Sequence, residues 1–173
     1  TLGIIGFGNV GVRLSNLVKG FDMKILVNSK SLESRKKDYP HVENVSFEDL
    51  ISKSDIISFH CKAPKDGKPM ISKEHYKKIK PTAYIINAAR GNIVDEKDLN
   101  EALNENLIAG AAVDVLSEEP PPSDHCLINE SIPNLLVSPH IAWISVESRK
   151  RLINGVSSNI KAFLNKSPIN QVS

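Results

Sequence analysis

Cysteine, tryptophan and long apolar runs are scarce in this sequence. Its 173 residues include one tryptophan and two cysteines, Cys61 and Cys126. Two cysteines so far apart form neither a disulfide framework nor the ligand spacing of a metal site, so we expect no metal and a reducing compartment, the cytoplasm. No apolar run approaches the roughly 20 residues that a membrane span needs. The N-terminus lacks the basic start and the cleavage site of a secretory signal.

An excess of charge of one sign is also missing. The formal net charge is +2, and 24% of the residues are charged. The basic runs at 35–37 and within 73–80 are expected on solvated surface, so we expect neither nucleic acid nor a membrane as a partner. A hydrophobic content of 40% is ordinary for a globular protein, and the length allows one domain with a real core.

A glycine-rich turn directly follows the apolar residues 2–5, and an amphipathic run follows the turn. The spacing Gly6-x-Gly8-x-x-Gly11 is typical of a dinucleotide-binding turn. Gly6 permits the tight turn, Gly8 lets a pyrophosphate approach the backbone, and Gly11 lets the next helix pack closely, with its N-terminal amides facing the phosphates. The alternative is the same turn without a ligand. The predicted cofactor contacts here are Gly6, Phe7, Gly8, Asn9, Val10 and Gly11.

Strands alternate with helices along the rest of the chain. We expect strands at 2–5, 23–27, 41–45, 55–60, 83–87, 108–113 and 135–137, helices after the glycine turn and at 47–51, 72–79, 95–103 and 146–164, and a loop with a helical turn at 29–37. Most of the strands are continuous apolar runs, which is typical of a parallel sheet covered on both faces. The predicted fold is α/β, a Rossmann-type doubly wound parallel sheet with helices on both faces.

Ligands of such sheets bind beyond the carboxyl ends of the strands, so the residues that follow each strand are informative. Asn28, Ser29 and Lys30 follow the second strand, where an NAD-specific site usually has an Asp or Glu that holds the ribose hydroxyls. Ser29 and Lys30 favour a 2′-phosphate, with Arg35 assisting, but NAD bound through backbone and Ser29 is equally compatible; the cofactor is NAD or NADP. His60, at the end of the fourth strand, lines the cofactor site or packs in the core.

Arginine, acidic residues and histidine follow the last three strands. Arg90 is placed to form a fork with a carboxylate, unless it pairs at the surface with Asp95. Asp114 and Glu119 follow the sixth strand, and His140, a side chain suited to proton transfer near neutral pH, follows the seventh. A neighbouring Glu would orient His140 and raise its pKa. The remaining histidines are expected at the surface or in loops: His41, His75 and His125.

Three stretches resemble one family, the D-isomer-specific 2-hydroxyacid dehydrogenases. They are residues 6–11, residues 80–95, and residues 112–120 taken together with 138–143. The second and third stretches are more specific than the first, and the similarity covers nearly the whole chain. The Pro-His-Ile-Ala-Trp form of 139–143 is most similar to the glycerate dehydrogenase/hydroxypyruvate reductase branch.

The resemblance implies a role for each matching residue. Arg90 would bind the substrate carboxylate and polarise the 2-oxo group, and His140 would be the general acid in reduction and the general base in oxidation. Glu119 would pair with His140 and hold it protonated, and Asp114 would bind the nicotinamide carboxamide. Trp143 would wall the substrate pocket, or else be a core or interface aromatic. The cofactor contacts would also include Ala88 and Ala89.

The family also has a second, substrate-binding domain. We therefore expect residues 1–173 to be the dinucleotide-binding domain of a longer homodimeric enzyme, with a long C-terminal helix and tail at 146–173, and to show little turnover alone. The implied reaction is hydride transfer between NAD(P) and a small 2-oxo or 2-hydroxy acid such as hydroxypyruvate or D-glycerate. Alternatives are a phosphoglycerate or lactate dehydrogenase and a non-catalytic dinucleotide-sensing scaffold. Ser29 and Lys62 depart from the family's usual acidic residue and proline.

Overall fold

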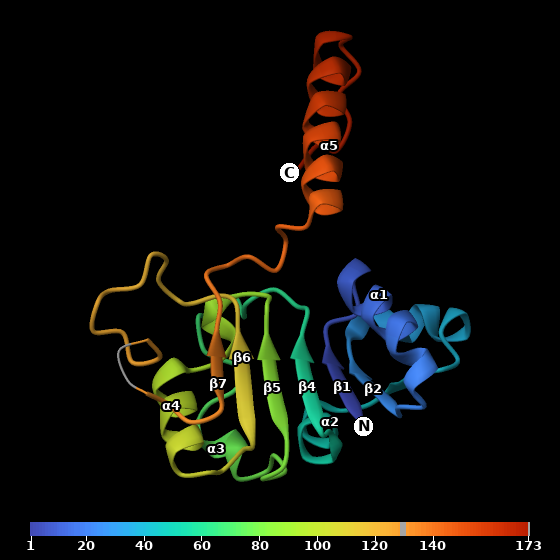
Figure 1. Cartoon of the computed structure of the whole chain (residues 1–173). Coiled ribbons are helices and arrows are strands. Elements are labelled where there is room, and N and C mark those ends of the chain that lie inside the picture. Colours follow the sequence, from blue (N-terminus) through green and yellow to red (C-terminus); the bar gives the residue numbers. More distant parts are fainter. Residues whose placement is uncertain (129–130, 173) are drawn as a thin grey trace. The chain divides into compact units, whose positions relative to one another are not determined.

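Residues 1–139 are built on a parallel sheet of seven strands (Figure 1). The computed structural model describes residues 1–128 and 131–172. The strand order is β3-β2-β1-β4-β5-β6-β7, and every neighbouring pair is parallel. The strands are β1 (Leu2–Ile5), β2 (Ile25–Asn28), β3 (Glu43–Asn44), β4 (Ile56–Phe59), β5 (Tyr84–Asn87), β6 (Gly110–Val113) and β7 (Leu135–Val137). The predicted α/β doubly wound fold is confirmed.

Short helices connect these strands. They are α1 (Asn9–Val18), α2 (Phe47–Lys53), α3 (Lys73–Tyr76) and α4 (Glu96–Asn104), with 3-10 helices η1 (Lys19–Phe21), η2 (Lys30–Asp38) and η3 (Gly91–Ile93). A longer helix, α5 (Val146–Leu164), follows β7. Two helix starts are capped as their sequences suggest: Ser46 accepts from the Asp49 amide, and Asp95 accepts from the amides of Lys97 and Asp98.

The chain divides into two compact units, residues 1–139 and residues 140–173. The first unit holds the whole sheet and the buried core. The core has two parts, one around Leu50, Ile57 and Phe59 and the other around Ile4 and Val27. The second unit consists of a short segment, α5 and the residues that follow α5, which the structure describes as far as Val172.

The strands of the first unit are aligned at their carboxyl ends. Asn28 is level with Ile5, Ile5 with Phe59, and Phe59 with Asn87. The same level continues across β6 to Val137 of β7. Because all of these strands are parallel, the residues that follow them form one line along a single edge of the sheet. In strand order, that line is Ser29, Gly6, His60, Ala88, Asp114 and Ser138.

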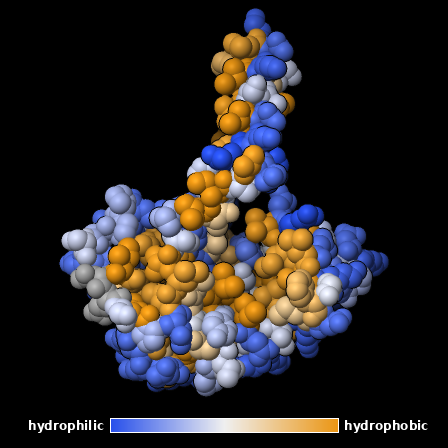
Figure 2. Space-filling model, in the orientation of Figure 1, coloured by the Kyte–Doolittle hydropathy of each residue, from blue (hydrophilic) through white to orange (hydrophobic). Residues whose placement is uncertain are grey.

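The two faces of the sheet differ in how they are covered. Right-handed connections that run from β1 toward β3, and from β4 toward β7, place α1 on one face and α3 and α4 on the other. Side chains on β5 consequently alternate: Ile85 is buried, whereas Tyr84 and Ile86 are exposed. With Leu136 of β7 they line an apolar groove of about 510 Å³ on the first unit, and apolar surface over these strands is visible in Figure 2.

Two segments differ from the expectation in their local structure. Residues 30–38 form a 3-10 helix where a loop with one helical turn was predicted. The helix predicted over 72–79 is shorter, because regular helix ends at Tyr76 and the amide of Lys78 already bonds back to the His75 carbonyl. Several strands are also one or two residues shorter than predicted, as at β2, where Asp22 turns the chain with a φ of 54°.

Candidate active site

The glycine turn after β1 is built by close backbone contacts. Gly6 has a φ of 93°, and a Cβ added to it would lie 2.5 Å from the carbonyl oxygen of His60. A Cβ on Gly11 would lie 2.4 Å from the carbonyl oxygen of Gly6. Each position therefore needs glycine, the first for its conformation and both for the lack of space. These contacts draw the start of α1 against the end of β1.

The space above this turn is open. A Cβ on Gly8 would meet no atom within 4 Å, and Asn9 and Val10 beside it are exposed. The first hydrogen bond of α1 runs from the Val12 amide to the Gly8 carbonyl. The amides that come before Val12 in the first turn therefore have no acceptor within the helix. An open backbone surface at the N-terminus of a ten-residue helix fits a dinucleotide pyrophosphate.

Phe7 and Asn28 direct their side chains away from this opening. The Phe7 ring is buried and packs edge-on against Tyr39, with 5.1 Å between ring centroids. The side-chain amide of Asn28 donates to the Val45 carbonyl at 2.9 Å, and the backbone carbonyl of Asn28 accepts from the Gly6 amide. Both residues thus shape the turn through their backbones.

Arg35 lies beside the glycine turn, although it is 28 residues away in the sequence. Its Nη2 donates to the Phe7 carbonyl at 2.7 Å and to the Ser31 hydroxyl at 3.2 Å, and its guanidinium lies over the Tyr39 ring. Ser29, at the end of β2, contacts Ser31 through a hydroxyl pair at 3.0 Å. Arg35, which is predicted to assist in binding a 2′-phosphate, is therefore held at the glycine turn by its own contacts.

Carboxylates near the end of β2 are directed elsewhere. Glu33 accepts a hydrogen bond from the Asn44 side chain at 2.9 Å. Lys30 is exposed as the first residue of η2. The end of β2 thus presents hydroxyl and basic groups, and Glu33 is tied to Asn44 of β3.

His60 contributes backbone to the glycine turn and a neutral ring to its surroundings. Its amide donates to the Ile5 carbonyl, and its carbonyl lies against Gly6. Its Nε2 is 2.9 Å from the Ser58 hydroxyl. Burial lowers the pKa of His60, so the ring is uncharged at neutral pH.

A buried asparagine shapes the turn that carries Arg90. Asn87 is 1% exposed, and its side chain accepts from the Ala89 amide and donates to the Arg90 carbonyl. The exposed guanidinium of Arg90 donates to the Ala89 carbonyl. Asp95, the alternative partner of Arg90 in the sequence analysis, instead caps α4. No role was predicted for Asn87; the signal that could have indicated one is a polar residue at the end of an apolar strand.

Asp114 is fixed at the end of β6. It is 7% exposed, its amide donates to the Asn87 carbonyl, and its carboxylate accepts from the Ser138 hydroxyl at 2.6 Å. Ser138 therefore orients Asp114 across the β6–β7 boundary.

Glu119 lies on the loop that follows Asp114, and the start of this loop lies against Gly91. Its carboxylate accepts from the Leu116 amide at 2.9 Å. A Cβ on Gly91 would lie 2.0 Å from the Leu116 carbonyl carbon and 2.2 Å from the Ser117 nitrogen. The absent side chain of Gly91 thus lets the loop of Glu119 lie against the residue that follows Arg90.

His140 is the first residue of the second unit. Its φ is 52°, in the left-handed region that histidine enters more readily than most residues. The indole nitrogen of Trp143 donates to the His140 carbonyl at 2.9 Å, and Trp143 is half exposed. Trp143 thus holds the backbone of His140 within this unit.

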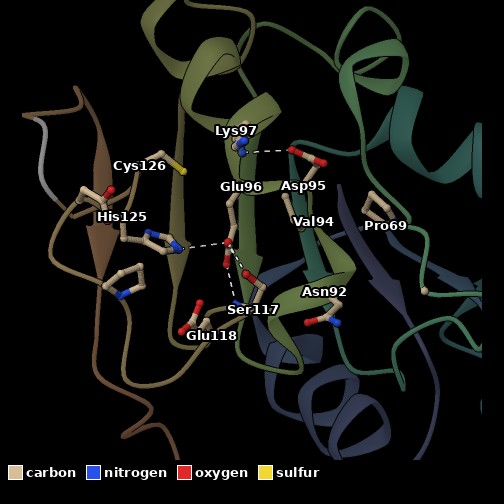
Figure 3. A pocket seen from close by; sticks show the side chains of 13 residues that line it. Pro69, Asn92, Val94, Asp95, Glu96, Lys97, Ser117, Glu118, His125 and Cys126 are labelled. Atoms are coloured by element: carbon tan, nitrogen blue, oxygen red, sulfur yellow. Dashed lines mark hydrogen bonds and ion pairs between the residues drawn. The ribbon is translucent and has the colours of Figure 1, made fainter.

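A polar cavity of about 560 Å³ lies between the start of α4 and the loop after β6 (Figure 3). Glu96 points into the space between its two walls, where it meets Ser117 and His125 from the loop. His125 is not an ordinary loop residue, because its side chain is only 8% exposed. Cys126 lies beside it, and burial raises the pKa of its thiol.

Within residues 1–128 and 131–172, no three His, Cys, Asp or Glu side chains are grouped so that they could hold a metal ion. Neither cysteine in that part of the chain forms a disulfide. The same residues include no helix with the length and hydrophobicity needed to cross a membrane.

Comparisons with known proteins identify the family. Residues 1–142 match the model of the D-isomer specific 2-hydroxyacid dehydrogenase NAD binding domain. A glycerate dehydrogenase of Methylorubrum extorquens is 37% identical over 172 residues, which are 99% of this chain and 52% of that protein. The chain spans about half the length of the curated relatives it matches.

Solved structures agree with this result. D-lactate dehydrogenase of Lactobacillus jensenii with NAD+ superimposes with a TM-score of 0.85 at 28% identity, covering 99% of this chain and 55% of that one. An acyclic imino acid reductase in complex with NADPH and D-Arg gives a TM-score of 0.84 at 30% identity, covering 99% and 53%. The chain belongs to the D-isomer-specific 2-hydroxyacid dehydrogenases and carries their NAD-binding domain.

Proposed function

We propose that this chain is the cofactor-binding domain of a dehydrogenase that transfers hydride between a nicotinamide dinucleotide and a small 2-oxo or 2-hydroxy acid such as hydroxypyruvate or D-glycerate. The observation that carries the proposal is the level register of the parallel strands, because it aligns the glycine turn with the residues after β5 and β6. The glycerate dehydrogenase relative supports this choice of substrate.

In this proposal, Arg90 binds the substrate. Its guanidinium is exposed on a turn that the Asn87 side chain fixes by hydrogen bonds to the Ala89 amide and the Arg90 carbonyl. A planar guanidinium can form two hydrogen bonds with a carboxylate, and it can stabilise the negative charge that develops on the 2-oxo oxygen during reduction. Asp114, fixed by Ser138, binds the carboxamide of the nicotinamide.

His140 moves the proton. The bound nicotinamide supplies the hydride for reduction and accepts it in oxidation. His140 donates a proton to the 2-oxo oxygen in reduction and takes it from the 2-hydroxyl group in oxidation. Glu119 pairs with His140 and favours its protonated form, which is the form that reduction requires.

A panel of 2-oxo acids tests the proposal. We expect the full-length protein to reduce hydroxypyruvate or glyoxylate with NADH or NADPH, and residues 1–173 alone to bind the dinucleotide weakly with little turnover. Pyruvate and 3-phosphohydroxypyruvate are the comparison substrates, because a higher kcat/KM on either one would favour the lactate or phosphoglycerate alternative. A full-length protein that binds the dinucleotide and reduces none of these acids would support the sensing scaffold.

We further propose that NADPH is the preferred cofactor. Ser29 and Lys30 stand where an NAD-specific site has an acidic residue, and Arg35 is held at the glycine turn by the Phe7 carbonyl. Glu33, the first acidic residue of η2, is engaged by the side chain of Asn44. The solved imino acid reductase with a similar fold contains NADPH.

Ser29→Asp in the full-length protein tests the cofactor choice. A carboxylate at this position repels a 2′-phosphate and accepts from ribose hydroxyls, so the ratio of kcat/KM for NADPH to that for NADH should fall by about 10- to 100-fold, the range of a charged hydrogen bond. Ser34→Asp, which places the same charge on exposed η2, is the matched control and should leave the ratio unchanged. A wild-type ratio below one would refute the preference.

We also propose a cytoplasmic homodimer. Support for a reducing compartment comes from Cys61 and Cys126, which form no disulfide in the described structure. Support for a partner comes from exposed apolar side chains on α5, among them Leu152, Val156 and Phe163. Patches of this kind mark interaction surfaces. Light scattering on the full-length protein should give twice the monomer mass, and a monomeric mass would refute the dimer.

A further inference from the structure

Glu96, at the start of α4, has a largely buried carboxylate that binds the loop after β6. Its side chain is 14% exposed. One oxygen accepts from the Ser117 amide at 2.7 Å, and the other accepts from the Ser117 hydroxyl at 2.6 Å and lies 3.1 Å from His125 Nε2 (Figure 3). Its place in the first turn of a helix favours its negative charge. Two points of the loop, eight residues apart in sequence, therefore converge on one carboxylate.

The hydrogen bonds of His125 define which of its nitrogens carries the proton. Its Nδ1 accepts from the Leu127 amide at 3.2 Å, so the proton is on Nε2, which donates to Glu96. The backbone of His125 is also engaged, since its amide donates to the Pro122 carbonyl. A neutral imidazole thus satisfies both of its ring contacts in this arrangement.

A second residue of α4 holds the same loop. The side-chain amide of Asn100 donates to the Cys126 carbonyl at 2.8 Å. Glu96 and Asn100 are four residues apart, so they lie on one face of the helix. That face therefore contacts the loop at Ser117, His125 and Cys126.

The residues that Glu96 holds are adjacent to those of the proposed active site. Ser117 follows Leu116, whose amide binds the Glu119 carboxylate. Leu116 and Ser117 are also the residues that lie against Gly91, which follows Arg90. A movement of Ser117 would consequently be transmitted to Glu119 and to the Arg90 turn, because the missing Cβ of Gly91 leaves no gap between the two segments.

We propose that Glu96 is a positioning residue for the reaction, which it serves by anchoring Ser117 and His125 so that Glu119 and the Arg90 turn keep their places. The inference rests on the proposed function. Glu96 has no direct contact with the glycine turn in the interactions described above, so it acts through the loop. The influence of Glu96 should therefore appear in the rate of the chemical step and in the protonation of His140, which Glu119 favours. The affinity for the cofactor should be unaffected.

Glu96→Gln in the full-length protein is the test. The new side-chain NH2 would face either Nε2–H of His125 or the amide of Ser117, so one contact opposes two donors in either orientation. We expect kcat for 2-oxo acid reduction to fall by about 10- to 100-fold, the range for a misplaced catalytic group. The alkaline limb of the kcat profile should move to lower pH, because a displaced Glu119 supports protonated His140 less. The Kd for the dinucleotide should be unchanged.

Glu101→Gln is the matched control, since Glu101 lies on the same helix but forms an exposed ion pair with Lys73. It should leave kcat and the pH profile unchanged. Ser117→Ala removes only the hydrogen bond from the Ser117 hydroxyl to Glu96, so it should shift the pH profile in the same direction by a smaller amount. This variant replaces Glu96→Gln in the test if Glu96→Gln does not fold. An active wild type with a Glu96→Gln variant that keeps its kcat and pH profile overturns the inference, even if its Tm falls. A wild type inactive on every 2-oxo acid overturns the proposed function, and this inference with it.

Discussion

His140→Gln in the full-length protein is expected to lower kcat for 2-oxo acid reduction by about 10²- to 10⁴-fold, the usual contribution of a general acid. Glutamine keeps the backbone carbonyl that accepts from Trp143, so the local structure of the second unit should persist. It cannot donate and regain a proton at neutral pH. The measurement is steady-state reduction of hydroxypyruvate and glyoxylate across pH, and the limb of the profile that reports the proton donor should disappear.

His75→Gln is the matched control for this change. His75 belongs to the capping box of α3, where it contacts Ser72. In the first unit, α3 lies at the end of the sheet opposite to the glycine turn (Figure 1). Loss of the His75 side chain should lower the free energy of unfolding slightly and leave kcat unchanged. Titration with the dinucleotide should give the same Kd for both variants and wild type. Wild-type kcat in His140→Gln would remove His140 from the proton transfer.

Arg90→Lys in the full-length protein should lower kcat/KM for a 2-oxo acid by about 10²- to 10³-fold, comparable to removing a donor that stabilises a developing oxyanion. Lysine keeps the charge but loses the planar fork that can bind a carboxylate and the neighbouring oxygen together. Arg90 is exposed, and the turn that carries it is fixed by Asn87, so the variant should unfold at the wild-type temperature.

The substrate itself provides the control for Arg90. An ester of the same 2-oxo acid lacks the carboxylate, so wild type should reduce it poorly and Arg90→Lys should change its rate far less than that of the acid. The ratio of kcat/KM for acid to that for ester is the measured quantity. An unchanged ratio would show that Arg90 does not recognise the carboxylate.

The glycine turn shows how much of the cofactor site was predictable. Gly6, Gly8 and Gly11 were expected from their spacing, and the structure gives each a physical reason in a positive φ, an open surface or a close backbone contact. Local sequence determines such a turn because the requirement is on the backbone of neighbouring residues. Phe7 and Asn28 were expected at the cofactor as well, which stays a prediction; the Phe7 ring packs against Tyr39, and the Asn28 side chain binds the Val45 carbonyl.

Contacts between distant segments were not predictable. The placement of Arg35 at the Phe7 carbonyl joins residues 28 positions apart, and the contact of Gly91 with Leu116 joins two loops that meet only when β5 and β6 pair. His125 was expected to be an ordinary loop residue, since nothing in its neighbourhood indicates Glu96, which lies 29 positions earlier.

The sequence by itself determined the alternation of strands and helices, the parallel sheet, and the identity of the residues at its carboxyl edge, because hydrophobic periodicity and glycine spacing are local properties. The tertiary structure alone decided the level at which the strands align and the loop residues that the α4 face holds. The strands are mostly continuous apolar runs, which lack the alternation that would fix their register, and loop anchoring depends on packing between segments far apart in the chain.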